Sequence, residues 1–135
     1  MQYDYKKDHI AEDKQYDYCI AGAGPAGITL ALKLADKGFK VGLFEGGGLY
    51  YTSESQDLYD CEQTGMEAWP KHMRLRYFGG TSNHWSGRCK PFNEGDFKKK
   101  VMPNGIPGWP IGYSEVEPYL QKAKEIVDIG DVEFH

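Results

Sequence analysis

The feature that most restricts how this 135-residue chain can fold is a glycine-rich turn between two regularly patterned segments. Residues 16–21, YDYCIA, form a short β-prone run with side chains alternating between two faces. The run ends in GAGPAG, after which a helical apolar stripe extends to a natural stop at Gly38. A second apolar run, residues 41–44, ends at Glu45. This order predicts a parallel βαβ unit. The expected stripe consists of Ile28, Ala31, Leu32 and Ala35.

The turn also predicts a ligand. Gly22 permits the tight turn, Gly24 lets a pyrophosphate approach the backbone, and Gly27 lets helix and strand pack closely. Glu45 can accept hydrogen bonds from both hydroxyls of an adenosine ribose and repels a 2′-phosphate, which favours FAD or NAD over NADP. A glycine-rich turn that binds nothing is the simpler alternative. The predicted dinucleotide site comprises Gly22, Gly24, Pro25, Ala26, Gly27 and Glu45.

Charge, cysteine spacing and the lack of an apparent targeting segment limit the expected partners and location. Basic residues number 16 against 20 acidic ones, and the only basic run is residues 98–100, so no nucleic-acid partner is predicted. No signal peptide or membrane span is apparent, and three widely spaced cysteines fit neither a disulfide framework nor a metal site. We therefore expect a cytoplasmic α/β protein with a thin core. Residues 1–15 are predicted to be a mobile lead-in and residues 16–135 the domain.

A second glycine motif lies in the segment RLRYFGGTSNHWSGR, residues 74–88. The turn at its two glycines is followed by three residues that favour helix N-caps, Thr81, Ser82 and Asn83. Arg76 could pair with a phosphate, His84 offers an imidazole and Trp85 an aromatic plane. From the residues alone, the segment is either a ligand-contacting loop or an ordinary loop around a buried tryptophan.

The last segment predicts a packing helix. Ser114 and Glu117 have the spacing of a capping box, and Pro118 falls in the first turn, where its missing N–H costs little. The helix is expected to run to about Asp128. Its predicted buried face is Val116, Leu120, Ala123 and Val127.

Together these motifs resemble the N-terminal part of a glucose–methanol–choline (GMC) oxidoreductase. The resemblance rests on GAGPAG with GLFEGGG, on RYFGGTSNHWSGR and on GWPIGYSEVEPYLQKA, and covers residues 16–127. In that family an RxxGGxS motif lies against the FAD pyrophosphate and flavin. The form of the motif in this chain, GGTSNHW, is more similar to that of the pyranose oxidase and sugar or polyol dehydrogenase branches than to that of the alcohol oxidases. The motif is matched here by Arg76, Gly79, Gly80 and Ser82.

The resemblance assigns His84 a special position. Choline oxidase and pyranose oxidase carry at this sixth motif position a histidine joined covalently to the flavin, whereas other relatives keep the histidine without the bond. Many members have an asparagine at the next position, where this chain has Trp85. The FAD site implied by the resemblance adds Arg76, Gly79, Gly80, Thr81, Ser82, Asn83, His84 and Trp85.

The family places its catalytic histidine near the C-terminus of a much longer chain. The resemblance therefore implies a partial Rossmann-like FAD-binding domain with a loop-rich segment and a C-terminal helix, inactive alone and without catalytic residues. It would be a truncated reading frame or one piece of a split enzyme, with a complementary C-terminal portion as partner and a sugar, polyol or other alcohol as substrate. Three alternatives remain: a non-catalytic nucleotide-binding module, an interaction protein such as the Rab GDP-dissociation inhibitors, and an NAD-dependent dehydrogenase. The second glycine motif argues against the first and the third.

Overall fold

A computed structural model describes residues 2–8, 14–65, 70–98 and 109–130. The chain separates into two compact units, Met1–Ser86 and Gly87–His135. No boundary at this point was expected from the sequence. In the described residues, no helix is both long enough and apolar enough to cross a membrane.

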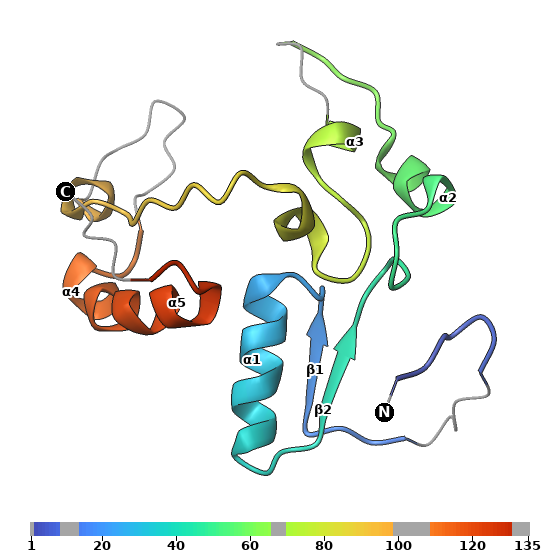
Figure 1. Cartoon of the computed structure of the whole chain (residues 1–135), viewed down its shortest axis with the longest axis horizontal. Coiled ribbons are helices and arrows are strands. Elements are labelled where there is room, and N and C mark those ends of the chain that lie inside the picture. Colours follow the sequence, from blue (N-terminus) through green and yellow to red (C-terminus); the bar gives the residue numbers. More distant parts are fainter. Residues whose placement is uncertain (1, 9–13, 66–69, 99–108, 131–135) are drawn as a thin grey trace. The chain divides into compact units, whose positions relative to one another are not determined.

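The predicted βαβ unit is present in the first of these units. Strand β1 (Tyr18–Ala21) leads into helix α1 (Pro25–Asp36), and strand β2 (Val41–Phe44) follows. The strands pair in parallel, with Tyr18 opposite Val41 and Ala21 opposite Phe44, and α1 runs beside them (Figure 1). Strand β1 starts two residues later than the apolar pattern suggested, because pairing begins where β2 begins. The two strands form a two-stranded sheet.

Helix α1 ends as its sequence predicts. Gly38 adopts a φ of 88°, and its amide donates to the Ala35 carbonyl while the Phe39 amide donates to Leu34. These two bonds form a Schellman motif, which needs a left-handed residue at the Gly38 position. Glycine adopts that conformation without the penalty that a Cβ atom brings.

The predicted helix stripe is only partly correct. Ile28 and Ala31 are half-buried, as is Leu34, but Leu32 and Ala35 are exposed. A sheet of two strands offers the helix a narrow surface, so one row of side chains rests on it and the next row faces away. Leu32 remains 61% exposed. The thin core expected from composition is confirmed, since Ala23 and Phe97 are the buried apolar residues among those described.

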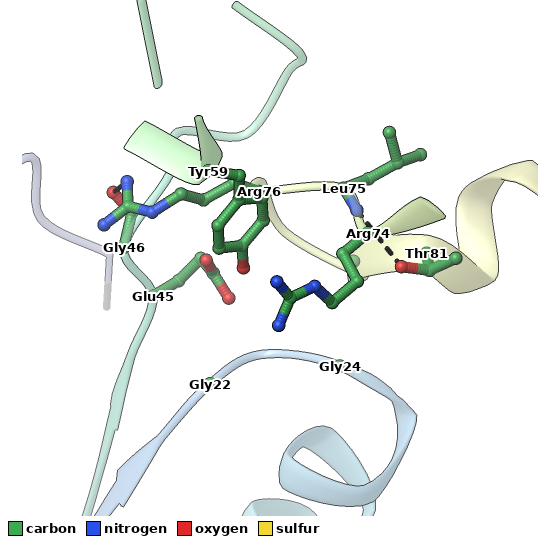
Figure 2. A pocket seen from close by; sticks show the side chains of 10 residues that line it. Gly22, Gly24, Glu45, Gly46, Tyr59, Arg74, Leu75, Arg76 and Thr81 are labelled. Atoms are coloured by element: carbon green, nitrogen blue, oxygen red, sulfur yellow. Dashed lines mark hydrogen bonds between the residues drawn. The ribbon is translucent and has the colours of Figure 1, made fainter. Parts of the chain in front are cut away.

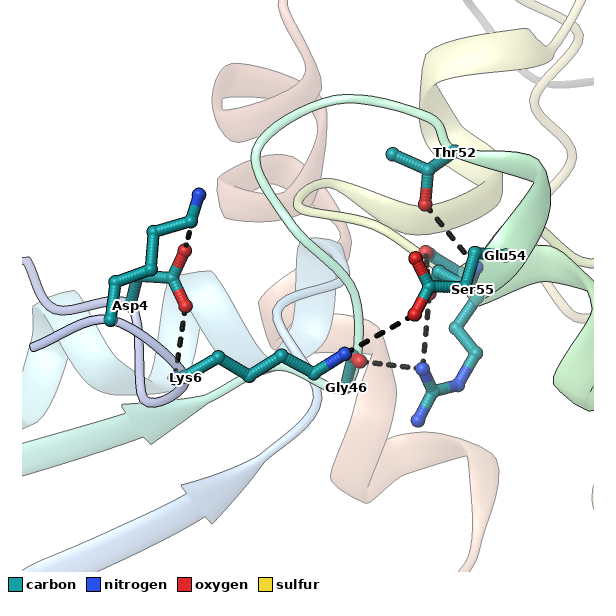
Figure 3. A network of polar contacts seen from close by, with 8 residues as sticks. Asp4, Lys6, Gly46, Thr52, Glu54 and Ser55 are labelled. Atoms are coloured by element: carbon teal, nitrogen blue, oxygen red, sulfur yellow. Dashed lines mark hydrogen bonds and ion pairs between the residues drawn. The ribbon is translucent and has the colours of Figure 1, made fainter.

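Short helices follow β2 in the first unit, and three of those described begin within residues 46–71, where turn residues gave no clear pattern of regular structure. They are α2 (Ser53–Gln56), η1 (Asp57–Tyr59), α3 (Pro70–Met73) and η2 (Gly80–His84). The Thr52 side chain caps α2 by accepting from the Ser55 amide at 3.2 Å. Near this helix Lys6 forms an exposed ion pair with Glu54 at 3.4 Å (Figure 3). Pairs so exposed contribute little stability.

The second unit is organised around aromatic rings. It contains η3 (Glu94–Phe97), α4 (Tyr113–Val116), η4 (Glu117–Tyr119) and α5 (Leu120–Val127). Phe97, which is 8% exposed, has Phe92, Trp109 and Tyr113 around it at centroid distances of 5.7 to 6.1 Å. Lys98 is exposed, while residues 99 and 100 of the basic run lie outside the described residues.

The capping box predicted for the last segment is wrong by two residues. Gly112 precedes α4, and the Glu115 carboxylate accepts from the Gly112 amide at 2.7 Å, so the hydroxyl of Ser114 is not the cap. The single helix that was predicted is divided into α4, η4 and α5, with Pro118 in the 3-10 turn η4. Helix α5 ends at Val127, close to the predicted end, with Asp128 in the left-handed conformation. Of its predicted buried face, Val116 and Leu120 are half-buried, whereas Ala123 and Val127 are exposed.

Candidate functional site

The turn between β1 and α1 has the geometry that its glycines predict. Gly22 has a φ of 99° and donates its amide to Phe44 at 2.7 Å, which bends the chain away from the strand. A Cβ atom on Gly27 would overlap the Gly22 carbonyl oxygen, so only glycine allows this approach of helix and strand. A Cβ atom on Gly24 would meet no atom within 4 Å. The surface above Gly24 is therefore open.

The carboxylate of Glu45 is tied to this turn. Oε2 accepts from the Ala23 amide at 2.8 Å, and Oε1 accepts from the Gly47 amide at 3.1 Å. The sequence suggested ribose hydroxyls as its donors, but these backbone amides already occupy one position on each oxygen. A carboxylate oxygen has a second lone pair, so Glu45 keeps acceptor capacity toward a ligand. Its first role in the structure is to hold the end of β2 against the glycine turn.

The second glycine motif lies against the first. The Gly79 amide donates to the Ala23 carbonyl at 2.8 Å, and the Phe78 amide donates to Gly48 at 2.9 Å. Gly79 and Gly80 have φ values of 88° and 58°, so the segment turns sharply at this point. Two motifs separated by about half of the first unit thus meet through backbone hydrogen bonds.

A cleft of about 420 Å³ lies where the motifs meet (Figure 2). Both glycine turns, the acid that follows β2 and the segment before Gly79 contribute to its walls, and all of them belong to the first unit. The lining residues are Gly22, Gly24, Glu45, Gly46, Tyr59, Arg74, Leu75, Arg76, Gly80 and Thr81.

Arg76, expected to pair with a phosphate, has acceptors inside the protein. Its Nη1 atom donates to the Gly46 carbonyl and, at 3.0 Å, to Ser55 Oγ. Ser55 Oγ in turn donates to the Arg76 carbonyl at 3.1 Å. Figure 3 shows these contacts between α2 and the loop at Gly46. Arg76 therefore joins α2 to the rim of the cleft.

Gln56 supports the wall of the cleft in a way that the sequence did not reveal. Its side chain is 2% exposed, and Nε2 donates to the carbonyls of Lys71 and Arg74 at 2.6 and 2.7 Å. Oε1 accepts from the Arg76 amide at 3.0 Å. One amide group thus holds the segment that forms a wall of the cleft. An isolated glutamine in a polar stretch carries no sequence signal for such a role.

A small charge cluster supports the same wall. Lys71 Nζ lies 2.7 Å from Asp57 Oδ1 and 2.9 Å from Asp60 Oδ2, which links η1 to α3. These hydrogen bonds, first to Asp57 and then to Asp60, raise the pKa of Lys71 above its ordinary value. Lys71 therefore stays charged throughout the physiological range.

At the second motif the helix begins earlier than predicted and is a 3-10 turn. Gly79 is the N-cap of η2, and the expected capping residues lie within the 3-10 turn. Thr81 Oγ1 accepts from the Leu75 amide at 3.1 Å, Ser82 Oγ donates to the Gly79 carbonyl, and Asn83 Nδ2 donates to Phe78 at 2.7 Å. The positive φ values at the two glycines start the turn earlier than a serine or threonine cap would.

The remaining predicted site residues lie outside the lining of the cleft. His84 and Trp85 follow at the end of η2 and are exposed, Trp85 by 47%, so the alternative of a buried tryptophan is wrong. Within the described parts of the chain, the His84 side chain forms no hydrogen bond or ion pair. The other residues outside the lining are Pro25, Ala26, Gly27, Gly79, Ser82 and Asn83.

Metal binding finds no support in the part of the chain that the structure describes. No three His, Cys, Asp or Glu side chains gather there in an arrangement that could hold an ion. Cys19, Cys61 and Cys89 are free thiols.

Comparison with known proteins gives relatives that are named dehydrogenases. The chain is 32% identical to an oxygen-dependent choline dehydrogenase of Xanthomonas campestris pv. campestris, over 90% of this chain and 25% of that protein. It is 26% identical to 2-methyl-1,2-propanediol dehydrogenase of Mycolicibacterium austroafricanum, over 85% and 25%. It is 29% identical to dehydrogenase mpl7 of Monascus purpureus, over 84% and 21%.

The chain thus spans about a quarter of the length of these relatives. No protein-family model matches the sequence, and no solved structure is significantly similar to it.

Proposed function

We propose that this chain is the FAD-binding N-terminal portion of a GMC-type oxidoreductase that acts on CH–OH groups of a sugar, polyol or other alcohol. The observation that carries the proposal is that the GAGPAG turn, Glu45 and the RYFGGT segment line one and the same cleft. A βα turn without a ligand does not require the second glycine motif. The similarity to dehydrogenases, among them a choline dehydrogenase, agrees with an oxidoreductase of this type.

The residues present fit the adenosine diphosphate half of the cofactor. Gly24 leaves open space at the start of α1, where first-turn amides have no partner within the helix and the helix dipole favours an anion. Glu45 has spare lone pairs for ribose hydroxyls. FAD, when bound, supplies the acceptor for a hydride. The role of this chain is to hold the cofactor rather than to move the substrate proton.

The part of the site that would hold the flavin is less complete than the part that would hold adenosine diphosphate. His84 lies outside the cleft lining, and the second motif contributes only Gly80 and Thr81 beyond its arginine. We propose that the remaining flavin contacts, including any bond to His84, require a complementary C-terminal portion that also supplies catalytic residues. The isolated chain should not turn over.

Calorimetric titration of the chain with ADP and with FAD tests the proposal. We expect measurable binding of both with similar affinity, because the contacts lie in the half that the two ligands share. FAD binding far tighter than ADP binding would mean that the flavin pocket is already formed, and no binding of either ligand would reject the dinucleotide site.

Variants at Glu45 sharpen the assignment. Glu45→Ala removes a charge-assisted acceptor worth about 1.5 to 3 kcal/mol, which corresponds to a loss of affinity of about ten- to hundredfold. Since Glu45 also holds the turn, Glu45→Gln serves as the conservative comparison. Glu54→Ala is the matched control, because Glu54 is an exposed acid outside the cleft lining. Equal affinity in all three variants would contradict the role given to Glu45.

A further inference from the structure

The two arginines of the segment before Gly79 have different surroundings. The Arg76 guanidinium is held by the Gly46 carbonyl and Ser55 Oγ. The Arg74 guanidinium lies over the Tyr59 ring, with its central carbon 5.0 Å from the ring centre. Among the residues that the structure describes, no carboxylate pairs with Arg74. Its charge is therefore available to a ligand.

The side chain of Arg74 extends into the cleft. Figure 2 shows its guanidinium above the turn from Gly22 to Gly24, on the side of the cleft away from Gly46. Glu45 approaches the same space from the end of β2. The cleft consequently presents an acceptor at one position and a cation at another, both next to the open backbone at Gly24.

The backbone that carries Arg74 is fixed on both sides of the side chain. Gln56 Nε2 holds the Arg74 carbonyl at 2.7 Å, and Thr81 Oγ1 accepts from the next amide, that of Leu75, at 3.1 Å. Stacking on Tyr59 restricts the guanidinium itself. A cation held in this way loses less conformational freedom on binding than a lysine on a free loop.

We propose that Arg74, and not Arg76, binds the anionic group of a nucleoside diphosphate over the Gly22–Gly24 turn. Arg76 is a positioning residue that joins the rim of the cleft to α2. The inference rests on the proposed function and adds an orientation: the diphosphate faces Arg74 while the ribose hydroxyls face Glu45. A planar guanidinium suits this role because it can donate two parallel hydrogen bonds to phosphate oxygens.

The test compares two ligands that differ only in the diphosphate. ADP and adenosine are titrated into the 135-residue chain by NMR chemical-shift perturbation, which also measures millimolar affinities. Arg74→Gln should weaken ADP binding by about ten- to hundredfold and leave adenosine binding unchanged. Arg74→Lys should retain part of the ADP affinity. Arg88→Gln is the matched control, since Arg88 is an exposed arginine of the second unit.

The outcomes separate this inference from the function on which it rests. If the wild type binds ADP and Arg74→Gln binds it equally well, the role of Arg74 is rejected while the nucleotide site stands. Equal losses for ADP and adenosine would mean that Arg74 only supports the wall, which also rejects the inference. If the wild type binds neither ligand, the proposed function itself fails. Loss confined to ADP supports both.

Discussion

Gln56 offers a sharp test of how the cleft is built. Replacing it with leucine keeps the size of the side chain but removes its three hydrogen bonds. The carbonyls of Lys71 and Arg74 and the amide of Arg76 lose their partner in a position that is 2% exposed. We expect the wall formed by residues 71–76 to loosen while the βαβ unit stays intact.

The magnitude follows from the unpaired groups. Each group that is left without a partner costs about 1 to 2 kcal/mol, so three cost about 3 to 6 kcal/mol. Burial of the leucine side chain returns about 2 kcal/mol. The net loss of about 1 to 4 kcal/mol corresponds to local opening that is about five- to thousandfold more frequent.

Amide hydrogen exchange measures this local opening. The best reporters are the amides of Phe78 and Gly79, which bond to Gly48 and Ala23 and not to Gln56. Both should exchange faster in Gln56→Leu, whereas Gln121→Leu, an exposed position in α5, should leave them unchanged. Unchanged exchange in Gln56→Leu would refute the conclusion that this side chain organises the wall.

Three further predictions concern the site and its surroundings. Gly24→Val should abolish ADP binding and leave the circular dichroism spectrum unchanged, because the position is open. Gly27→Ala should lower the melting temperature, because its Cβ atom would overlap the Gly22 carbonyl oxygen. The reverse pattern would contradict the roles of the two glycines. Because the pKa of Lys71 is raised, its stabilising contribution is present below its usual pKa of 10.5 and fades only as the pH rises toward the raised value. The difference in melting temperature between wild type and Lys71→Met should therefore be constant from pH 6 to pH 9, about the range where Lys71 stays charged. A difference that shrinks within this range would contradict the stabilising role of the Lys71 charge. In a protein completed by a C-terminal portion, we expect His84 to lie at the flavin. Yellow protein after acid precipitation, with a flavin-bearing peptide at His84, would establish a covalent bond. Flavin released by the acid would limit His84 to a noncovalent contact, which the flavin spectrum of His84→Ala tests, and flavin attached to another residue would contradict the assignment.

Local signals in the sequence were sufficient for the βαβ unit. The period of the apolar residues, the glycines at tight positions and the stop at Gly38 each act over a few neighbouring residues. Such patterns are readable because the backbone requirement of a turn or a cap lies within one or two residues. The same locality explains the errors at η2 and α4, where several polar residues in a row could each serve as a cap.

The sequence by itself determined the two glycine motifs and the acid between them, because each carries its chemistry in residue type and spacing. Only the tertiary structure decided which side chains complete the cleft. The fold places Arg74 in it, bonds Arg76 to Gly46 and Ser55, and buries Gln56 against the backbone of residues 71–76. These choices depend on contacts between residues far apart in the chain. The motif in the sequence singled out Arg76, but residue type and spacing do not fix the direction of either guanidinium. The direction of each guanidinium depends on the nearest acceptor or ring, which the fold alone supplies.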